Sequence, residues 1–241
     1  MIASRTLSTA FQPIRDLSNG HVVGVEALTR FSGEPDRSPE EWFADAASSG
    51  CAAELEFLAM KTALNAAAEL PNHLFVSVNL SPTACLDRRM VALLEESRVT
   101  PTRIVLELTE HCAVTDYESL KASLAWAREA GLRIAVDDTG AGFASMRHVL
   151  QLRPDFIKLD RTIVAGLDAD DAKKAFGSAM VKFAEGISAT LVTEGLETVG
   201  ELAAVMELGV PVGQGYLLGE PTVHPEEWSK WRNHDPQAAS T

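Results

Sequence analysis

Short apolar runs recur along the chain and alternate with stretches of helical periodicity. Eight runs have the length and composition of buried strands. They span residues 6–14, 22–28, 75–80, 104–109, 133–136, 156–160, 190–194 and 212–217. Between most of these runs, apolar positions recur at the spacing of an amphipathic helix. We predict helices over residues 39–48, 52–70, 116–130, 146–152 and 199–208, and mixed helical segments over 82–97 and 161–187.

Turn and capping residues mark several boundaries between these elements. Residues 18–20 (Ser-Asn-Gly) predict a tight turn, which makes the first two strands a hairpin. Ser38 and Glu41 have the spacing of a capping box, with a proline at the first helical position between them. Gly131 follows the helix predicted over 116–130 and is expected to end it.

The order of elements predicts the fold class. After the hairpin, strands and helices alternate, which indicates a parallel sheet covered by helices. About eight strands in 241 residues fit a closed barrel better than an open sheet. We predict an α/β fold, a TIM-like (β/α)8 barrel with the hairpin at its N-terminus. It forms one domain over residues 1–241, and we expect a polar, disordered tail over 233–241.

The most unusual chemistry lies near the middle of the chain. Asp137 and Asp138 directly follow one apolar strand, and Gly140 and Gly142 come next, so we expect the two acids on a tight turn. Lys158 stands inside the next apolar strand. Buried charges are costly unless they are paired or bind a metal. This pattern therefore indicates a functional site rather than a plain core.

Polar residues stand at the predicted C-terminal ends of seven strands. They are Glu26, Asn79, Glu107, Asp137 with Asp138, Lys158, Glu194 and Gln214. In a (β/α)8 barrel these ends meet at one mouth, where barrel enzymes have their active sites. We therefore expect the side chains to converge although they are far apart in sequence.

The donor types in this set point to a hard cation. Carboxylate and amide oxygens suit Mg²⁺ or Mn²⁺ rather than zinc. Two such ions about 4 Å apart would neutralise the acids and suit in-line attack of water on phosphorus. Lys158 could then orient that water or stabilise developing charge. The alternative is that some of these acids form ordinary ion pairs. For Asp160, which is followed by Arg161, an ion pair and a functional role are equally favoured.

Composition narrows the class further. The charge of -13 gives no general attraction to nucleic-acid polymers or anionic membranes. The six histidines fall mainly outside the strand ends, which argues against a histidine metal site. The cysteines, Cys51, Cys85 and Cys112, have no CxxC spacing and are expected to be reduced. The sequence shows no secretory signal and no membrane span, so we expect a cytoplasmic protein.

Seven short motifs in order resemble those of one family. They are Glu26-Ala27-Leu28, with Phe11-Gln12-Pro13-Ile14 before it and Arg30 after it; Val78-Asn79-Leu80-Ser81; Glu107-Leu108-Thr109-Glu110; residues 137–142 (DDTGAG); Ile157-Lys158-Leu159-Asp160; Thr193-Glu194-Gly195-Leu196-Glu197; and Gln214-Gly215-Tyr216 with Pro221. Over about residues 8–225 the chain resembles the EAL-domain cyclic di-GMP phosphodiesterases.

The resemblance implies hydrolysis of cyclic di-GMP to linear 5'-pGpG with two Mg²⁺ or Mn²⁺ ions. The implied metal ligands are Glu26, Asn79, Glu107, Asp137, Asp138 and Glu194, and the implied catalytic residues are Lys158, Glu194 and Glu26. The implied substrate contacts are Gln12, Leu28, Arg30, Asp160 and Gln214. Glu110, Glu197, Gly140 and Gly142 would support the loops around the site. The family's barrel has one antiparallel strand, in agreement with the predicted hairpin.

The sequence also departs from the family pattern. Thr139 stands in place of a phenylalanine, Ala141 in place of a threonine, and residues 143–145 read Phe-Ala-Ser instead of YSS. None of these is an implied metal ligand, so the departures concern the behaviour of the loop. The resemblance also implies a homodimer. With no sensory or cyclase motif beside the barrel, regulation is expected in trans, through assembly, or through a part absent from this sequence.

Two other functions compete with the enzyme. One is an EAL barrel that binds cyclic di-GMP or a protein partner without turnover. The retention of every implied acid and of Lys158 favours the enzyme over this receptor. The other is an unrelated metal-dependent lyase or aldolase barrel, against which the seven ordered motifs argue.

Overall fold

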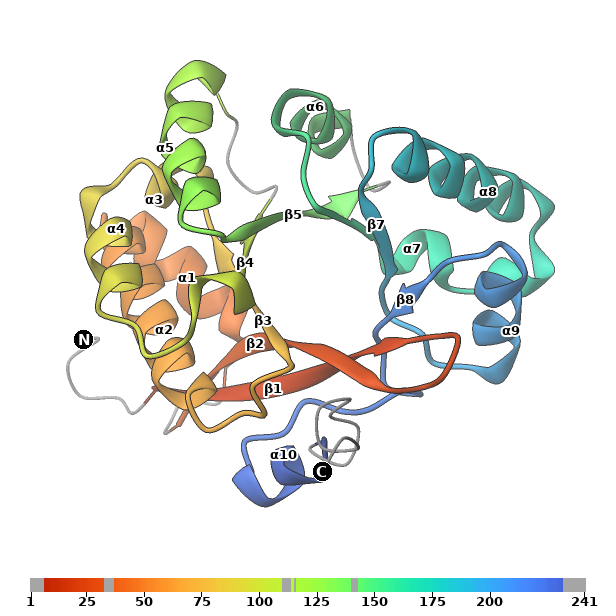
Figure 1. The fold of residues 1–241 in the computed structure, drawn as a ribbon, viewed down its shortest axis with the longest axis horizontal. Helices are drawn as coiled ribbons and strands as arrows, with labels where there is room; N and C mark the ends of the chain where they lie inside the picture. The colour runs from red at the N-terminus through yellow and green to blue at the C-terminus, as the bar shows by residue number, and fades with distance from the viewer. Residues whose placement is uncertain (1–6, 33–36, 110–113, 115, 140–142, 232–241) are drawn as a thin grey trace.

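The computed structural model describes residues 7–32, 37–109, 114, 116–139 and 143–231. Within these ranges the strands close into a barrel in the order β1 to β8 (Figure 1). They are β1 (Leu7–Asp16), β2 (Val22–Phe31), β3 (Phe75–Leu80), β4 (Ile104–Leu108), β5 (Arg133–Thr139), β6 (Phe156–Leu159), β7 (Thr190–Thr193) and β8 (Val212–Gly213). Strand β1 is antiparallel to both β2 and β8, and all other pairs are parallel. The predicted barrel with one antiparallel strand is confirmed.

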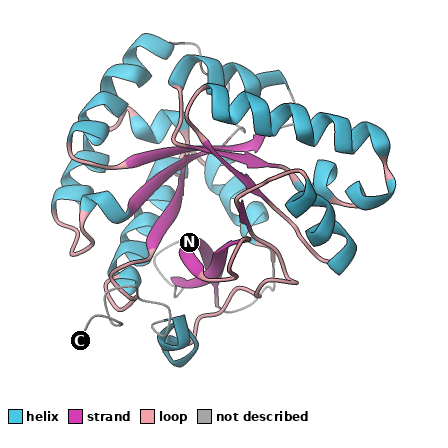
Figure 2. Ribbon diagram, turned by 45° about the vertical axis from the view of Figure 1, so that its right-hand side comes forward, coloured by secondary structure: helices cyan, strands magenta, loops and turns pink. Residues whose placement is uncertain are grey.

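Helices surround the barrel, and the strands lie inside their ring (Figure 2). They are α1 (Pro39–Ser48), α2 (Ala52–Ala67), α3 (Pro82–Cys85), α4 (Arg88–Glu95), α5 (Tyr117–Glu129), α6 (Phe143–Leu152), α7 (Arg161–Val164), α8 (Asp171–Gly186), α9 (Val199–Glu207) and α10 (Pro225–Lys230). Two short 3₁₀ helices, η2 (Pro101–Arg103) and η3 (Leu167–Ala169), complete the set in this part of the chain.

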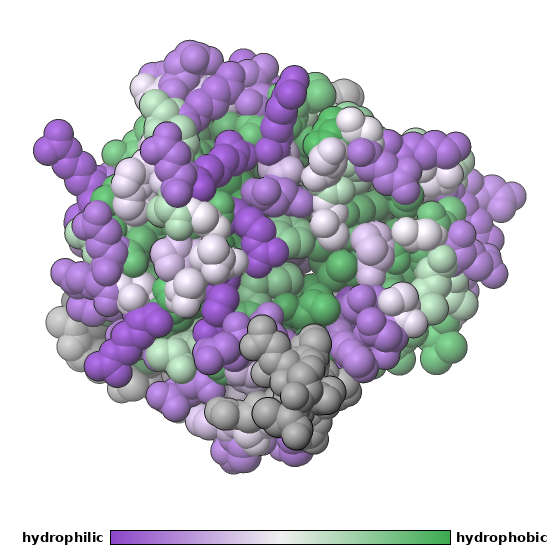
Figure 3. Space-filling view, in the orientation of Figure 1, coloured by the Kyte–Doolittle hydropathy of each residue, from purple (hydrophilic) through white to green (hydrophobic). Residues whose placement is uncertain are grey.

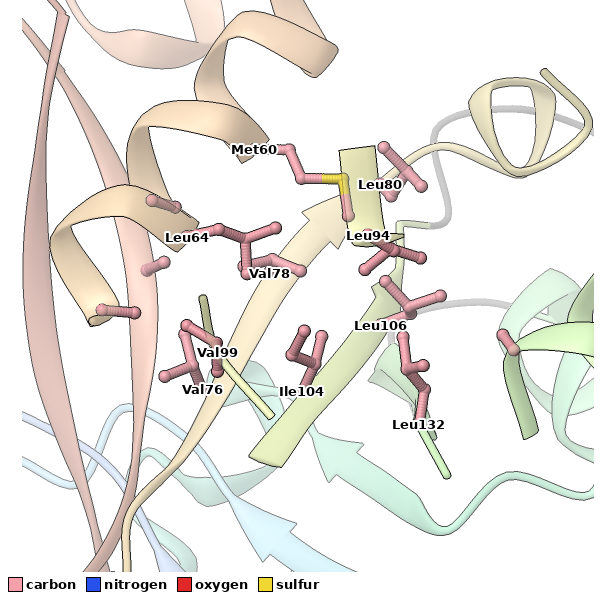
Figure 4. Packing of buried hydrophobic residues seen from close by; sticks show 14 of the residues in the cluster. Met60, Leu64, Val76, Val78, Leu80, Leu94, Val99, Ile104, Leu106 and Leu132 are labelled. Carbon is pink, nitrogen blue, oxygen red and sulfur yellow. The ribbon is translucent and has the colours of Figure 1, made fainter. Parts of the chain in front are cut away.

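The outward face of the barrel packs against these helices. On β3, Val76, Val78 and Leu80 point out of the barrel because strand side chains alternate, and they meet Met60 and Leu64 of α2 (Figure 4). All five side chains are almost fully buried. Burial of large aliphatic side chains is the main favourable term in folding, at about 1.5–3 kcal/mol each.

Aromatic side chains fill the interior of the barrel at the end where the parallel strands begin. The ring centroids of Phe75 and Phe156 are 5.3 Å apart, and the guanidinium of Arg133 lies over both rings. Gly24 makes room for this packing, since a β-carbon there would lie 2.4 Å from the Phe75 ring. These aromatic side chains fill the barrel interior at the end of the strands opposite to the polar groups.

The N-terminal hairpin carries the last helix on its outer side (Figure 1). Phe11 of β1 is fully buried, and its ring meets the edge of Trp228 of α10 at 4.9 Å. Helix α10 was not predicted from the sequence, because its six residues are too few to show a clear helical period. Helix α10 is held by the contact between Trp228 and Phe11, which are far apart in sequence.

Several local predictions are confirmed. The turn after β1 has Gly20 at φ 76°, a left-handed conformation that glycine adopts without strain. Helix α1 has the capping box formed by Ser38 and Glu41. Gly131, at φ 96°, follows the end of α5. The tail over 233–241 lies outside the described residues.

Other boundaries differ from the prediction. Strand β5 extends through Asp137 and Asp138 to Thr139, so the two acids belong to the strand rather than to a turn. Strand β2 extends to Phe31, because its outer half remains paired with β1 up to Leu7. Helix α6 begins three residues earlier than predicted. The region predicted as helical over 161–187 is broken into α7, η3 and α8.

The last strand is shorter than predicted. The apolar run from Val212 to Leu217 predicted a strand, but β8 ends at Gly213. The chain then turns against Leu196, whose N–H donates to the Gln214 carbonyl at 3.1 Å. The approach is so close that a β-carbon on Gly215 would lie 2.2 Å from the Leu196 backbone. This close packing ends the strand.

The face of the molecule in the orientation of Figure 1 is mixed in polarity. Figure 3 shows hydrophilic residues interspersed with apolar ones over one face of the molecule, with many of the hydrophilic residues at its rim. Across the described ranges, every helix is too short or too polar to cross a membrane.

Candidate functional site

The inward-facing residues of four neighbouring strands change from apolar to charged toward the mouth of the barrel. The pairs, two residues apart, are Val105 and Glu107 on β4, Ala135 and Asp137 on β5, Phe156 and Lys158 on β6, and Val192 and Glu194 at the end of β7. Because strand side chains alternate, each pair shares one face. A small cavity inside the barrel is lined by both kinds of residue, including Val105, Glu107, Phe156 and Lys158.

Lys158 lies at the centre of the charged layer. Its side chain is 2% exposed. Its Nζ lies 2.6 Å from Glu194 Oε1, 3.3 Å from Glu26 Oε2 and 3.6 Å from Asp137 Oδ1, and it also donates to Glu107 Oε1. Four carboxylates therefore surround one ammonium, and the centre carries excess negative charge.

The pKa values reflect this excess. Burial raises the pKa of the Glu107 carboxyl to about 8, although the Lys158 ammonium opposes the rise. The Glu26 and Asp137 carboxylates raise it further. Burial also raises the pKa of Glu194 well above its ordinary value. Burial lowers the pKa of Lys158, but the surrounding carboxylates outweigh it and hold that pKa well above 10.5. Additional positive charge would stabilise the ionised acids.

Glu26 accepts hydrogen bonds from three side chains, of which Lys158 is one. The Asn79 amide donates to Glu26 Oε1 at 2.9 Å, and the Gln214 amide donates to Oε2 at 2.7 Å. Gln214 also donates to Gln12 Oε1 at 2.9 Å. Glu26 was expected at the end of its strand, but it lies in the middle of β2, opposite Gln12 of the antiparallel β1. The hairpin thus places Gln12 beside the acids.

The donor set fits a divalent cation. One oxygen each from Glu26, Glu107 and Glu194 lie within 4.8 Å of one another. Asp137 Oδ1 is buried and accepts no hydrogen bond from the described residues, with Lys158 3.6 Å away. Asn79 uses its NH₂ on Glu26, which leaves its oxygen for a cation. An all-oxygen set with an unsatisfied buried acceptor suits Mg²⁺ or Mn²⁺.

Two residues that support these groups were missed in the sequence. Ser77 Oγ donates to Glu107 Oε2 at 2.6 Å. Its position two residues before Asn79 on the same strand face could have revealed it. Glu56 of α2 accepts the Ser81 N–H at 2.8 Å and so holds the segment after Asn79. No local pattern indicates that contact, because it joins two elements.

Three predicted substrate contacts lie around the acidic centre without hydrogen bonds to it among the described residues. Leu28 and Arg30 follow Glu26 on β2, and Arg30 Nη1 donates to the Thr29 carbonyl at 3.0 Å. Asp160 caps helix α7, and its carboxylate accepts the Thr162 N–H at 2.9 Å. Their roles toward a ligand stay predictions.

The remaining predicted site residues either lie in loops or are not among the residues that the structure describes. Glu197 pairs with Arg161 at 2.7 Å. Asp138 belongs to β5, but its side chain is outside the described part. Glu110, Gly140 and Gly142 also lie outside the described residues.

A closed barrel with an acidic oxygen centre on its inward face defines a class, the (β/α)8 barrels built to hold hard cations. The EAL domain family model matches residues 1–221, and the chain belongs to the EAL domain family. This confirms the resemblance drawn from the motifs.

Among curated relatives, the Escherichia coli protein named probable cyclic di-GMP phosphodiesterase PdeB is 28% identical over 95% of this chain and 45% of its own length. The chain spans less than half of the curated relatives it matches most strongly. Among solved structures, the manganese and cyclic di-GMP complex of Klebsiella pneumoniae BlrP1 is 26% identical with a TM-score of 0.80, covering 90% of this chain and 56% of that one. The PaMucR phosphodiesterase complex with c-di-GMP is 25% identical with a TM-score of 0.81, covering 92% and 94%.

Proposed function

We propose that this chain is a phosphodiesterase that hydrolyses cyclic di-GMP to linear 5'-pGpG with two Mg²⁺ or Mn²⁺ ions. The observation that carries the proposal is the ring of four carboxylates around Lys158. Membership of the EAL domain family and the named complexes of similar structures support the choice of substrate.

The acidic centre would hold the cations through Glu26, Asn79, Glu107, Asp137, Asp138 and Glu194. When bound, divalent cations supply Lewis-acid charge and lower the pKa of a water for attack on phosphorus. The carboxyl groups of Glu107 and Glu194 are the nearest to the Lys158 ammonium, and that of Glu26 follows at 3.3 Å. We propose Glu26, Glu194 and Lys158 as the catalytic residues. The Lys158 ammonium is placed to stabilise negative charge that develops on a phosphoryl group.

Other residues would hold the substrate. Gln12 and Gln214 form a hydrogen-bonded pair beside Glu26, and Gln214 Oε1 is buried without a partner in the described part of the chain. An unsatisfied buried acceptor is costly, and a donor on a ligand would relieve that cost. Arg30 provides a guanidinium suited to a phosphate. Leu28 and Asp160 complete the proposed contacts.

The decisive experiment is incubation of the protein with cyclic di-GMP and Mn²⁺, followed by separation of the products. We expect 5'-pGpG, its loss in excess chelator, and its return with Mn²⁺ or Mg²⁺. Ca²⁺, which is larger and less demanding in geometry, should support binding better than turnover. Glu107→Gln is the matched variant, because it removes one carboxylate ligand at nearly constant volume, and we expect it to lose product formation.

The outcome separates the alternatives. Tight binding of cyclic di-GMP without product would favour the receptor, and turnover that continues in excess chelator would contradict the metal mechanism. Failure to bind cyclic di-GMP at all would leave a protein-interaction module as the better description.

A further inference from the structure

Two connections at the mouth of the barrel carry site residues, and they lie side by side. One follows Lys158 of β6 and runs through α7 to Gly166 and η3. The other follows β7, begins with Glu194, and runs to Thr198 before α9. We call them the β6 loop (residues 160–170) and the β7 loop (residues 194–198).

The carboxylate of Glu201, in the first turn of α9, joins the two loops. Its Oε1 accepts the Gly166 N–H of the β6 loop at 2.9 Å. Its Oε2 accepts the N–H groups of Glu197 and Thr198 of the β7 loop, both at 3.0 Å. Glu201 is 6% exposed, so its charge is compensated by these three backbone donors.

This arrangement goes beyond helix capping. The chain has a second capping box at α1, where Glu41 accepts only the Ser38 N–H of its own helix start, at 2.9 Å, apart from surface contacts with Arg37. Glu41 is exposed, whereas Glu201 is buried and reaches Gly166, 35 positions away in sequence. Capping alone needs neither the burial nor the contact with Gly166.

Two further contacts hold the loops together. The stem of Arg161 covers Gly195, where a β-carbon would lie 2.5 Å from Arg161 Cγ, and its guanidinium pairs with Glu197 at 2.7 Å. Gly200 lets α9 approach η3, since a β-carbon there would lie 2.5 Å from Asp168 Oδ2.

We propose that Glu201 is a positioning residue of the acidic centre, which fixes Glu194 relative to Lys158 by joining the loops that follow them. The ammonium of Lys158 and Glu194 Oε1 are 2.6 Å apart. Lys158 lies two residues before the β6 loop, and Glu194 is the first residue of the β7 loop. This positioning role rests on the proposed function, but it also predicts an effect on metal binding that can be measured without substrate. Outer contacts that orient metal ligands are typically worth about 10- to 100-fold in metal affinity or activity.

The first test uses the wild-type protein and a divalent cation, with no nucleotide. If Glu201 couples Gly166 to the centre, Mn²⁺ binding must order the β6 loop, because coupling between sites is reciprocal. For this NMR measurement diamagnetic Mg²⁺ stands in for paramagnetic Mn²⁺. Hydrogen exchange of the Gly166 amide should slow when saturating Mg²⁺ is added to the metal-free protein. The Ser38 amide, bound to Glu41, is the matched control and should not change. An unchanged Gly166 amide would overturn the proposal.

The second test measures the affinity for Mn²⁺ by calorimetry in Glu201→Gln and Glu41→Gln. The glutamine at 201 keeps one acceptor oxygen for the capping contacts but loses the second, so the link to Gly166 is cut. We expect the Mn²⁺ Kd of Glu201→Gln to rise about tenfold, with Glu41→Gln unchanged. Equal Kd values for wild type and a folded Glu201→Gln would refute the positioning role, and the wild-type exchange test decides if that variant does not fold.

A kinetic readout separates this proposal from the proposed function. If the protein hydrolyses cyclic di-GMP, Glu201→Gln should lower kcat at saturating Mn²⁺ while the nucleotide KM changes little, since Glu201 touches no predicted substrate contact. If the wild type shows no hydrolysis, the proposed function fails, yet the exchange and Mn²⁺ affinity measurements still decide the role of Glu201.

Discussion

At the scale of single residues, the balance of charge around Lys158 governs the site. One ammonium stands against four carboxylates, and Glu107 beside it is fully buried. Removing one member of a buried ion cluster leaves the remaining charges without compensation. Lys158 therefore has a structural role in the metal-free protein in addition to its proposed role in catalysis.

The substitution Lys158→Met tests both roles. It keeps the length of the side chain and removes the charge, so the metal-free protein should lose about 3–5 kcal/mol of unfolding free energy. Saturating Mn²⁺ should restore part of that loss. At saturating Mn²⁺, kcat should fall about 10²-fold or more, the effect of losing one transition-state contact, while nucleotide binding persists. Chemical denaturation with and without chelator, together with steady-state kinetics, measures these effects.

The control is Lys121→Met, which removes a lysine from a surface ion pair with Glu118 and should change stability by less than about 1 kcal/mol. Normal turnover by Lys158→Met would refute the catalytic role, and an unchanged stability in chelator would refute the structural one.

Thr139 presents a different problem, since its side chain is fully buried and its hydroxyl has no hydrogen-bond partner in the described residues. It lies at the end of β5, paired with Leu159. A buried hydroxyl without a partner costs about 1–3 kcal/mol. We also predict that Thr139, which stands in place of the family's phenylalanine, holds the following loop less firmly. That loop (residues 140–142) lies outside the described residues, so this stays a prediction.

Thr139→Val should therefore stabilise the protein. Valine has the same shape and lacks the unsatisfied hydroxyl, so we expect a gain of about 1 kcal/mol and a rise in Tm of about 2–4 °C. Calorimetry measures both. Thr193→Val is the matched control, because the equally buried Thr193 hydroxyl donates to the Val212 carbonyl at 3.5 Å and should show no such gain. A destabilised Thr139→Val would mean that the hydroxyl has a partner.

At the scale of elements, the junction of the β6 loop, the β7 loop and α9 depends on the ionised form of Glu201. Burial raises the pKa of this carboxyl, but the hydrogen bonds from Gly166, Glu197 and Thr198 outweigh burial and lower it below its ordinary value of 4.5. A group with a lowered folded-state pKa stabilises the fold above its unfolded pKa, and that contribution is lost as the pH falls through the folded value.

The stability difference between wild type and Glu201→Gln should therefore depend on pH. It should be constant from about pH 6 to 8 and shrink as the pH falls below 4.5, since the glutamine does not titrate. Denaturant unfolding across this range measures it. Ser38→Ala removes a neutral capping hydroxyl from the capping box of α1, which does not contact Glu201, so its effect should be nearly independent of pH. A pH-independent difference for Glu201→Gln would contradict the assigned ionisation.

At the scale of the whole molecule, assembly is the open prediction. The resemblance to the EAL family implies a homodimer, with Glu110 and the glycine loop linking the dimer surface to the metal site. Specific activity should then fall on dilution in parallel with dissociation, which sedimentation can follow. Glu110→Ala should lower turnover about 5- to 150-fold if the loss of a buried charged hydrogen-bond partner, about 1–3 kcal/mol, is expressed fully in activity. A monomer with constant specific activity would contradict this.

The sequence alone determined the order of elements and the chemistry of the site. Apolar runs of fixed length and the alternation of strands with helices are local features, so they predicted the barrel. The acids and Lys158 could be placed near one mouth because parallel strands bring their C-terminal ends together. Capping and turn residues such as Ser38 and Gly20 act within a few positions and were correctly assigned.

Tertiary structure alone decided how these residues meet. The register of β1 against β2 puts Gln12 opposite Glu26, and the packing of Leu196 on Gly215 ends β8 early. The contact of Glu201 with Gly166 joins positions 35 apart. None of these follows from local patterns, because each depends on two segments approaching within a few ångströms, and only the closed barrel fixes that distance.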